Sequence, residues 1–118
     1  MATGMTAFEQ EMAAVRDGLV EMASIVLTQI ERSVAAWEAT DATLAAEVIA
    51  ADDEVDDACI DLDERIFNLQ LLNSPVAGDQ RLLHVGLIAA IALERVGDLA
   101  VAISHLAGSV PVGGAGPA

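Results

Sequence analysis

The sequence predicts an all-α protein, folded as an antiparallel up-down-up bundle of three helices. Apolar residues recur at steps of three and four through most of the 118 residues, and no convincing stretch alternates with period two. Two breaks in this rhythm leave three segments of about thirty residues each. Because 54% of the residues are hydrophobic and only 3% are aromatic, we expect a core of Ala, Leu, Val and Ile and exclude a wholly disordered chain.

The first helix is predicted over residues 6–38, after a lead-in over residues 1–5. Thr6 stands three residues before Glu9, the spacing of a capping box, so the helix should begin there. Its apolar residues form a heptad-like stripe that we expect to face the core: Met5, Phe8, Met12, Val15, Leu19, Met22, Val26, Ile30, Val34 and Trp37.

The second helix is predicted over residues 42–72, with Asp41 as its cap. One face of it is apolar: Leu44, Val48, Ala51, Val55, Ala58, Cys59, Leu62, Ile66 and Leu69. The third helix is predicted over residues 75–107, with Ser74 as cap and Pro75 in the first helical position. Its stripe, which we expect to face the other two helices, is Leu82, Val85, Ala89, Ala92, Val96, Leu99, Ile103 and Leu106. Together, residues 6–107 form one domain, followed by a Gly/Pro-rich tail over residues 108–118 that we expect to be disordered.

The charge of the chain restricts the kinds of partner. A formal net charge of −14 argues against nucleic acids and anionic membrane surfaces, and favours cations or basic protein patches. The longest charge-free apolar stretch, residues 82–93, is too short to span a bilayer, which needs about 20 residues. A single cysteine, Cys59, cannot form an internal disulfide, and the N-terminus does not resemble a secretory signal. We therefore expect a cytoplasmic protein without membrane insertion.

Four carboxylates are the candidate site. If the second and third helices form a hairpin that turns near Ser74, positions equally far from the turn face each other. Asp52 and Asp56 lie as far before that turn as Glu94 and Asp98 lie after it, to within one turn of helix, so all four should be level. Such a group repels itself unless a cation joins it. Oxygen ligands suit a hard ion such as Mg²⁺, Mn²⁺, Ca²⁺ or Fe³⁺, so the sequence predicts a metal site at these four residues.

Two interpretations of the acidic run over residues 47–64 that involve no metal stay open. The run holds nine acids, and a solvated acidic face would account for them. Alternatively, Arg65 or Arg95 neutralises part of the cluster. No catalytic set is evident, because His84 and His105 have no Ser or Cys partner near them in spacing and Cys59 falls on the inner stripe.

Three segments, AEVIAADDEVDD, SPVAGDQR and LERVGDLA, occur in the order and spacing typical of a known family. On these motifs, over roughly residues 8–106, the chain resembles the PhoU family of phosphate-signalling regulators. The matching positions are Asp52, Val55 and Asp56, then Pro75, Val76, Ala77, Asp79 and Arg81, then Glu94, Arg95, Gly97 and Asp98.

This resemblance implies a non-enzymatic regulator that restrains the phosphate-starvation response, acting between a phosphate-transporter ATPase and a membrane sensor histidine kinase. It also implies metal clusters at Glu/Asp-x-x-x-Asp motifs and a body of two three-helix repeats, of which this chain holds one. Cys59 stands where the family often has Glu, which predicts a metal site that is leaner or absent.

Two other function classes and one assembly follow from the residues. The carboxylates would also suit a metal-dependent enzyme or a metal store, and the bundle would also suit a purely structural interaction module. A homodimer is expected, because the third helix is apolar nearly all round and two partner helices should leave Leu83, Leu87, Ile88 and Ile91 only partly covered.

Overall fold

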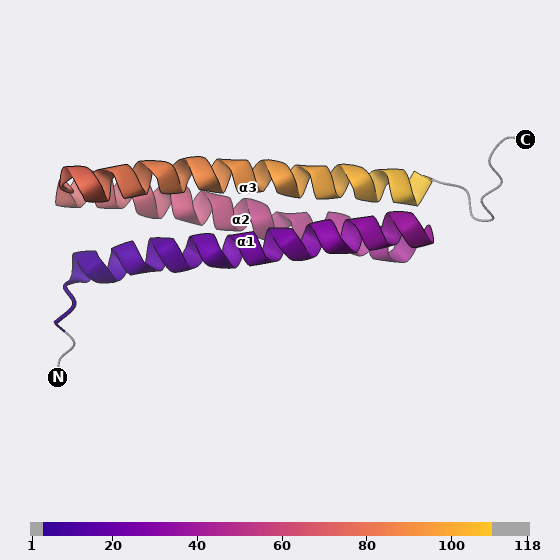
Figure 1. Cartoon of the computed structure of the whole chain (residues 1–118), viewed down its shortest axis with the longest axis horizontal. Coiled ribbons are helices and arrows are strands. Elements are labelled where there is room, and N and C mark those ends of the chain that lie inside the picture. The colour runs from indigo at the N-terminus through magenta and orange to yellow at the C-terminus, as the bar shows by residue number, and fades with distance from the viewer. Residues whose placement is uncertain (1–3, 110–118) are drawn as a thin grey trace, which may run out of the picture.

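A computed structural model describes residues 4–109 and shows three helices (Figure 1): α1 (Ala7–Ala39), α2 (Ala42–Asn73) and α3 (Ala77–Ser109). α1 and α3 run in the same direction and α2 runs against both, which confirms the all-α three-helix bundle. α3 includes Gly108 and Ser109, which were expected in the tail. The remainder of that tail, residues 110–118, and residues 1–3 of the lead-in lie outside the described part of the chain.

Short polar contacts fix the starts of the first two helices. Thr6 Oγ1 accepts a hydrogen bond from the Glu9 amide, and Glu9 Oε1 accepts one from the Thr6 amide, both at 3.0 Å. The predicted capping box is therefore confirmed. Asp41 Oδ1 accepts from the Leu44 amide at 3.0 Å, so Asp41 caps α2 as expected.

The connection before α3 differs from the prediction. Ser74 ends α2 in the left-handed conformation, with φ 43°, instead of capping α3. A residue before proline is sterically disfavoured in the right-handed helical region, so the helix cannot continue through Ser74 into Pro75. α3 begins two residues after Pro75, and the Gln80 amide donates to the Val76 carbonyl at 2.9 Å.

Large aliphatic and Met side chains from α1 and α2 form most of the core. The buried cluster contains Met12, Val15, Met22, Val26, Val55, Cys59, Leu62, Ile66, Leu69, Leu83 and Ala90. On α2 these are residues of the predicted inner stripe, because that helix alternates large apolar residues with acids. A smaller cluster of Ala36, Ala45 and Ala107 closes the other end of the bundle.

The predicted inner face of α3 is wrong. Its buried residues are mostly small: Leu83, Gly86, Ala90, Gly97, Ala100, Ser104 and Ala107. Six residues of the expected inner stripe are exposed instead: Leu82, Val85, Ala92, Val96, Leu99 and Leu106. A Cβ added to Gly86 would lie 3.3 Å from Leu19 Cδ1, so α3 packs against α1 through a surface that only small residues permit. The end of α1 shows the same preference, since Ser33 and Ala36 are buried while Val34 and Trp37 are exposed.

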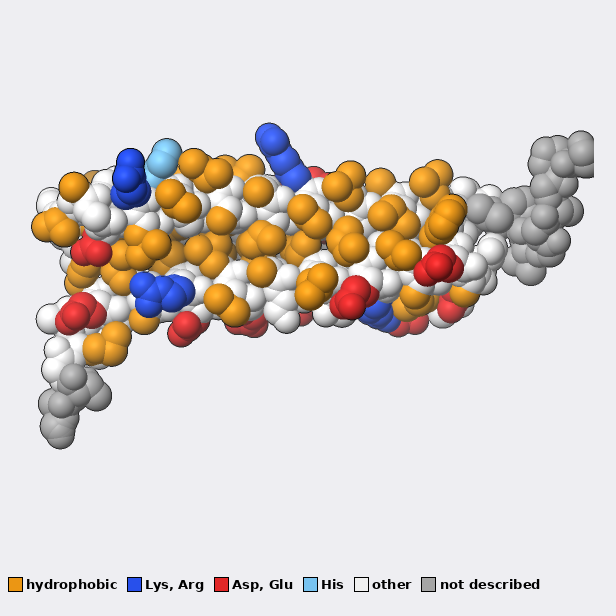
Figure 2. Space-filling model, viewed as in Figure 1, with side chains coloured by type: hydrophobic (Ala, Val, Ile, Leu, Met, Phe, Trp, Pro, Cys, Tyr) orange, Lys and Arg blue, Asp and Glu red, His pale blue; other side chains and the backbone are white. Residues whose placement is uncertain are grey.

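This packing leaves one side of the bundle apolar, and Figure 2 shows that side, with hydrophobic side chains along the boundary between α1 and α3. We call it the α1/α3 face, defined by exposed residues of both helices: Val20, Leu27 and Val34 of α1, and Leu82, Val85, Val96 and Leu99 of α3. Among residues 4–109, no helix combines the length and hydropathy that a membrane span requires.

Candidate functional site

The four predicted carboxylates lie where α2 and α3 pack together. Asp56 of α2 and Glu94 of α3 lie close together, since Asp56 raises the pKa of Glu94. Asp52 lies beside Gly97, since a Cβ added there would be 3.5 Å from Asp52 Oδ1. Three of the four are half-buried, and Asp98 is exposed. Counting residues from the turn thus placed these side chains at one level correctly.

Electrostatic repulsion acts within this group. Burial raises the pKa of Glu94, and the neighbouring Asp56, Asp98 and Asp52 raise it further. The pKa of Asp52 is also raised, first by burial and then by Asp56, Asp98 and Asp53. In both groups the ionised form is disfavoured relative to a solvated carboxylate. At neutral pH the α2–α3 contact therefore has an electrostatic cost that a cation would remove.

Carboxylate oxygens are suitable ligands for a hard cation. As placed, however, no three His, Cys, Asp or Glu side chains of residues 4–109 converge into a group that could hold a metal ion. Asp56 and Glu94 form one close pair, and Asp52 and Asp98 act on them through charge. The predicted metal site at these four residues stays a prediction, and binding there would require the side chains to reorient.

Gly97 is a site residue that the pattern of metal-ligating residues in the sequence does not include. It lies between Glu94 and Asp98 on α3, and its missing side chain lets α3 approach α2. A Cβ at this position would be 3.2 Å from Val55 Cγ1 and would also meet Asp52. A glycine inside a helix costs about 1 kcal/mol relative to Ala, so its presence in the middle of α3 was a signal of close packing.

The arginines do not neutralise the cluster. Arg65 Nε lies 2.9 Å from Asp61 Oδ2 and its Nη1 lies 3.5 Å from Glu11 Oε2, so Arg65 links α2 to α1 on another side. In the described part of the chain no ion pair joins Arg95 to the four carboxylates. Other acids of the run, including Asp53, Glu54 and Asp57, are exposed, so part of it is a solvated face.

Cys59 has the environment of a core residue. Its side chain is 9% exposed, and its thiol lies 3.9 Å from the carbonyl oxygen of Ala90 on α3. Burial raises the pKa of the thiol, as do the charges of Glu94, Asp63 and Asp56. A raised pKa favours the protonated thiol of Cys59 over the thiolate, and the thiol is the unreactive form. His84 and His105 are both exposed on α3.

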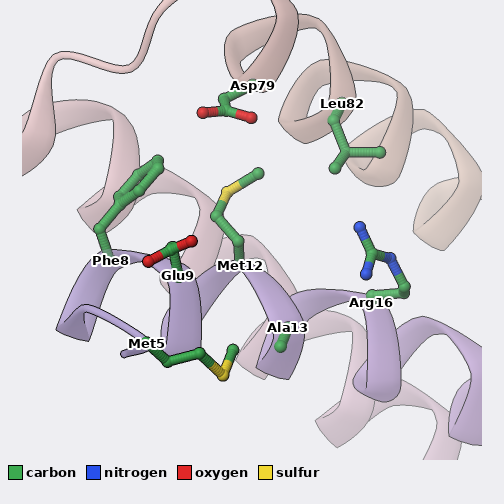
Figure 3. A pocket seen from close by; sticks show the side chains of 8 residues that line it. All are labelled: Met5, Phe8, Glu9, Met12, Ala13, Arg16, Asp79 and Leu82. Carbon is green, nitrogen blue, oxygen red and sulfur yellow. The ribbon is translucent and has the colours of Figure 1, made fainter. Parts of the chain in front are cut away.

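A hollow of about 310 Å³ lies near the starts of α1 and α3, away from the carboxylates (Figure 3). Its walls combine apolar and charged residues: Met5, Phe8, Glu9, Met12, Ala13, Arg16, Asp79 and Leu82. In Figure 3 the Arg16 guanidinium reaches toward Leu82, which places Arg16 beside the α1/α3 face. None of the four predicted metal ligands lines this hollow.

The comparisons with known proteins agree with the motifs. A family model described as the PhoU domain matches residues 19–107, which include all four carboxylates. The chain is 31% identical over 99 residues to the phosphate-specific transport system accessory protein PhoU homolog of Aquifex aeolicus, covering 83% of this chain and 44% of that protein. With the phosphate-specific transport system accessory protein PhoU of Escherichia coli it shares 30% identity over 100 residues, or 85% of this chain and 42% of that protein.

The chain thus spans less than half the length of these curated relatives. No solved structure shows a significant match to it. The family model covers about the last two thirds of α1, all of α2 and nearly all of α3, which is most of the bundle. The chain therefore belongs to the PhoU family.

Proposed function

We propose that this protein is a non-enzymatic regulator of phosphate transport and of the phosphate-starvation response. The observation that carries the proposal is the PhoU domain over residues 19–107, with relatives named as accessory proteins of a phosphate-specific transport system. In this role the protein acts in the cytoplasm, between a phosphate-transporter ATPase and a sensor histidine kinase. The buried environment of Cys59 argues against a cysteine nucleophile.

The proposal is tested in a host strain from which this gene has been deleted. A phosphate-regulated reporter should be expressed in phosphate-rich medium without the gene and should be repressed again by the wild-type gene. The double variant Asp56→Ala/Glu94→Ala should not restore repression if the carboxylates serve the regulatory role. Reporter expression that is unaffected by the deletion would overturn the proposed function.

We further propose that Asp52, Asp56, Glu94 and Asp98 bind a hard cation, which offsets their repulsion. A ligand that binds only the folded state stabilises it by about 2.7 kcal/mol at a hundredfold excess over Kd. Adding Mn²⁺, Mg²⁺, Ca²⁺ or Fe³⁺ to chelator-treated protein should therefore raise the melting temperature measured by circular dichroism.

The double variant Asp56→Ala/Glu94→Ala should lose this rise. Asp53→Ala/Asp57→Ala is the matched control, because it removes two exposed acids of α2 and should keep the rise. A melting temperature unchanged by all four ions would contradict metal binding and would leave the regulatory proposal standing.

The working unit is proposed to be a homodimer. The face that α3 was expected to turn inward is exposed, and Leu99 and Leu27 are 59% and 61% accessible. Soluble monomers rarely expose a continuous apolar surface of this kind, so a partner should cover it. Leu83, one of four residues expected to need that cover, is fully buried within the bundle and does not contribute.

A further inference from the structure

The α1 side of the α1/α3 face is symmetric along the helix. Val20 and Leu27 lie at equal distances from the midpoint between residues 23 and 24, on opposite sides of it. Arg16 and Glu31 lie further out, again at equal distances from the same midpoint. All four belong to one surface stripe, because neighbours among them are separated by one or two helical turns. The two apolar residues therefore mirror each other, and the two charged residues mirror each other with opposite sign.

The α3 side contains two symmetric pairs, which share the midpoint between residues 92 and 93. Ala89 and Val96 form the inner pair, and Leu82 and Ile103 form the outer pair. Two other exposed residues of the face, Val85 and Leu99, fall outside these pairs, because their symmetric positions, Ala100 and Gly86, are buried. The charged residues nearest this midpoint are Glu94, Arg95 and Asp98. Glu94 and Asp98 belong to the carboxylate group against α2, and Arg95 is exposed.

The two midpoints lie at the same height in the bundle. A Cβ on Gly86 would contact Val15 and Leu19, so Gly86 is level with the helical turn between them, centred on residue 17. α1 and α3 run in the same direction with the same rise per residue (Figure 1). Counting equally far onward from residues 17 and 86 therefore places residues 23 and 24 level with residues 92 and 93.

We propose that a second copy of this chain docks on the α1/α3 face about a two-fold axis that lies between the two copies, perpendicular to the helices and level with these midpoints. Each α1 then packs antiparallel on α1 of the other copy, and each α3 on α3. The axis places Val20 opposite Leu27 of the second copy, and Arg16 opposite Glu31 of the second copy. Because the two copies are equivalent, each of these contacts occurs twice in the interface. A two-fold interface requires such a self-complementary surface. The inference rests on the homodimer proposed above and is independent of the metal site.

Size and charge are consistent with this occupant. The symmetric stretch from Leu82 to Ile103 is about 33 Å long, and two adjacent helices are about 20 Å wide. That footprint is comparable to the roughly 800 Å² that each partner buries in a stable interface. The acidic run lies on α2, which Figure 1 shows behind α1 and α3 in this view. One opposing contact, Glu38 near Glu9 of the second copy, lies at the rim, where both residues are exposed and salt screens them.

The mass of the protein in solution gives the first test. At micromolar concentration, sedimentation should report about twice the 12.2 kDa chain mass. Leu27→Glu should give a folded monomer, with unchanged helix content by circular dichroism. Ile60→Glu is the matched control, because Ile60 is 57% exposed on α2 and should remain dimeric. A monomeric wild type, or a dimer broken by Ile60→Glu and not by Leu27→Glu, would overturn the proposal.

Exchange of charges tests the symmetry without an apolar substitution. Arg16→Glu and Glu31→Arg should each weaken the dimer at least tenfold in Kd, because each places like charges opposite one another twice. The double variant Arg16→Glu/Glu31→Arg restores opposite charges and should recover most of the affinity. Additive weakening in the double variant would exclude this pairing.

Cross-linking distinguishes the antiparallel arrangement from a parallel dimer. In a Cys59→Ser background, Ala23→Cys places a thiol next to the proposed axis, so mild oxidation should give a disulfide-linked dimer. In a parallel dimer, α1 of one copy would pack on α3 of the other, and the two thiols would be too far apart to bond. A dimer that does not cross-link would overturn the antiparallel arrangement. These tests involve neither metal nor phosphate, so they can fail while the regulatory function stands, and the reverse also holds.

Discussion

Replacing Leu83 by alanine should lower the free energy of unfolding by about 2–5 kcal/mol. Leu83 is fully buried in the main core cluster, and it is the largest buried residue of α3. Its truncation would leave a cavity among the Met12, Val15 and Leu19 side chains of α1, which line the same small hollow as Leu83. Urea denaturation followed by circular dichroism at fixed protein concentration measures the loss.

Leu72→Ala is the matched control, because the same side chain is 76% exposed there at the end of α2, outside the α1/α3 face. Exposed substitutions usually change stability by less than about 0.5 kcal/mol. Equal losses in the two variants would mean that α3 does not turn Leu83 inward, and the packing described for this helix would be wrong.

Gly86→Leu should also destabilise the bundle, by about 3 kcal/mol or more, because overpacking a close helix contact displaces the whole helix. The Cβ alone would come within 3.3 Å of Leu19 Cδ1 and 3.7 Å of Ile66 Cδ1, so the rest of a leucine has no room. Replacing a helical glycine gains about 1 kcal/mol in helix propensity, which is too little to offset the clash.

Gly78→Leu separates these two effects. Gly78 lies in the first turn of the same helix, and a Cβ added there meets nothing within 4 Å. This variant should unfold at the same temperature as the wild type or slightly higher in a thermal melt, while Gly86→Leu should melt at a clearly lower one. A wild-type melting temperature for Gly86→Leu would show that α1 and α3 are not in close contact at this height.

The fold and the face of α2 could be predicted from the sequence, whereas the face of α3 could not. α2 alternates large apolar residues with acids, so polarity alone specifies which side is buried. Between Leu82 and Leu93, α3 is apolar nearly all round, so polarity leaves its orientation undetermined. Side-chain size then decides, since Gly86 and Ala90 together permit a closer approach than Val85 and Ala89 would. That choice depends on the shape of the neighbouring helices, which a pattern of single residues does not contain.

That the four carboxylates lie at the same height along the bundle could be predicted, because α2 and α3 meet at one turn and have the same rise per residue. Their pairing could not, because it depends on side-chain rotamers and on the gap that Gly97 leaves beside Asp52. Ser74 was misassigned for a local reason: the sequence Ser-Pro is compatible with the start of a helix and also with the end of the preceding one.

The two short connections, Thr40–Asp41 and Ser74–Val76, also determine the order in which the bundle can assemble. Each joins helices that are neighbours in the chain, so the α1–α2 and α2–α3 hairpins form from local contacts, which close quickly. Contacts between α1 and α3, such as Leu19 with Gly86, join residues far apart in the chain and close the largest loop. The α1/α3 face exists only after this last closure. A second copy that docks as proposed would therefore recognise only a chain that has finished folding.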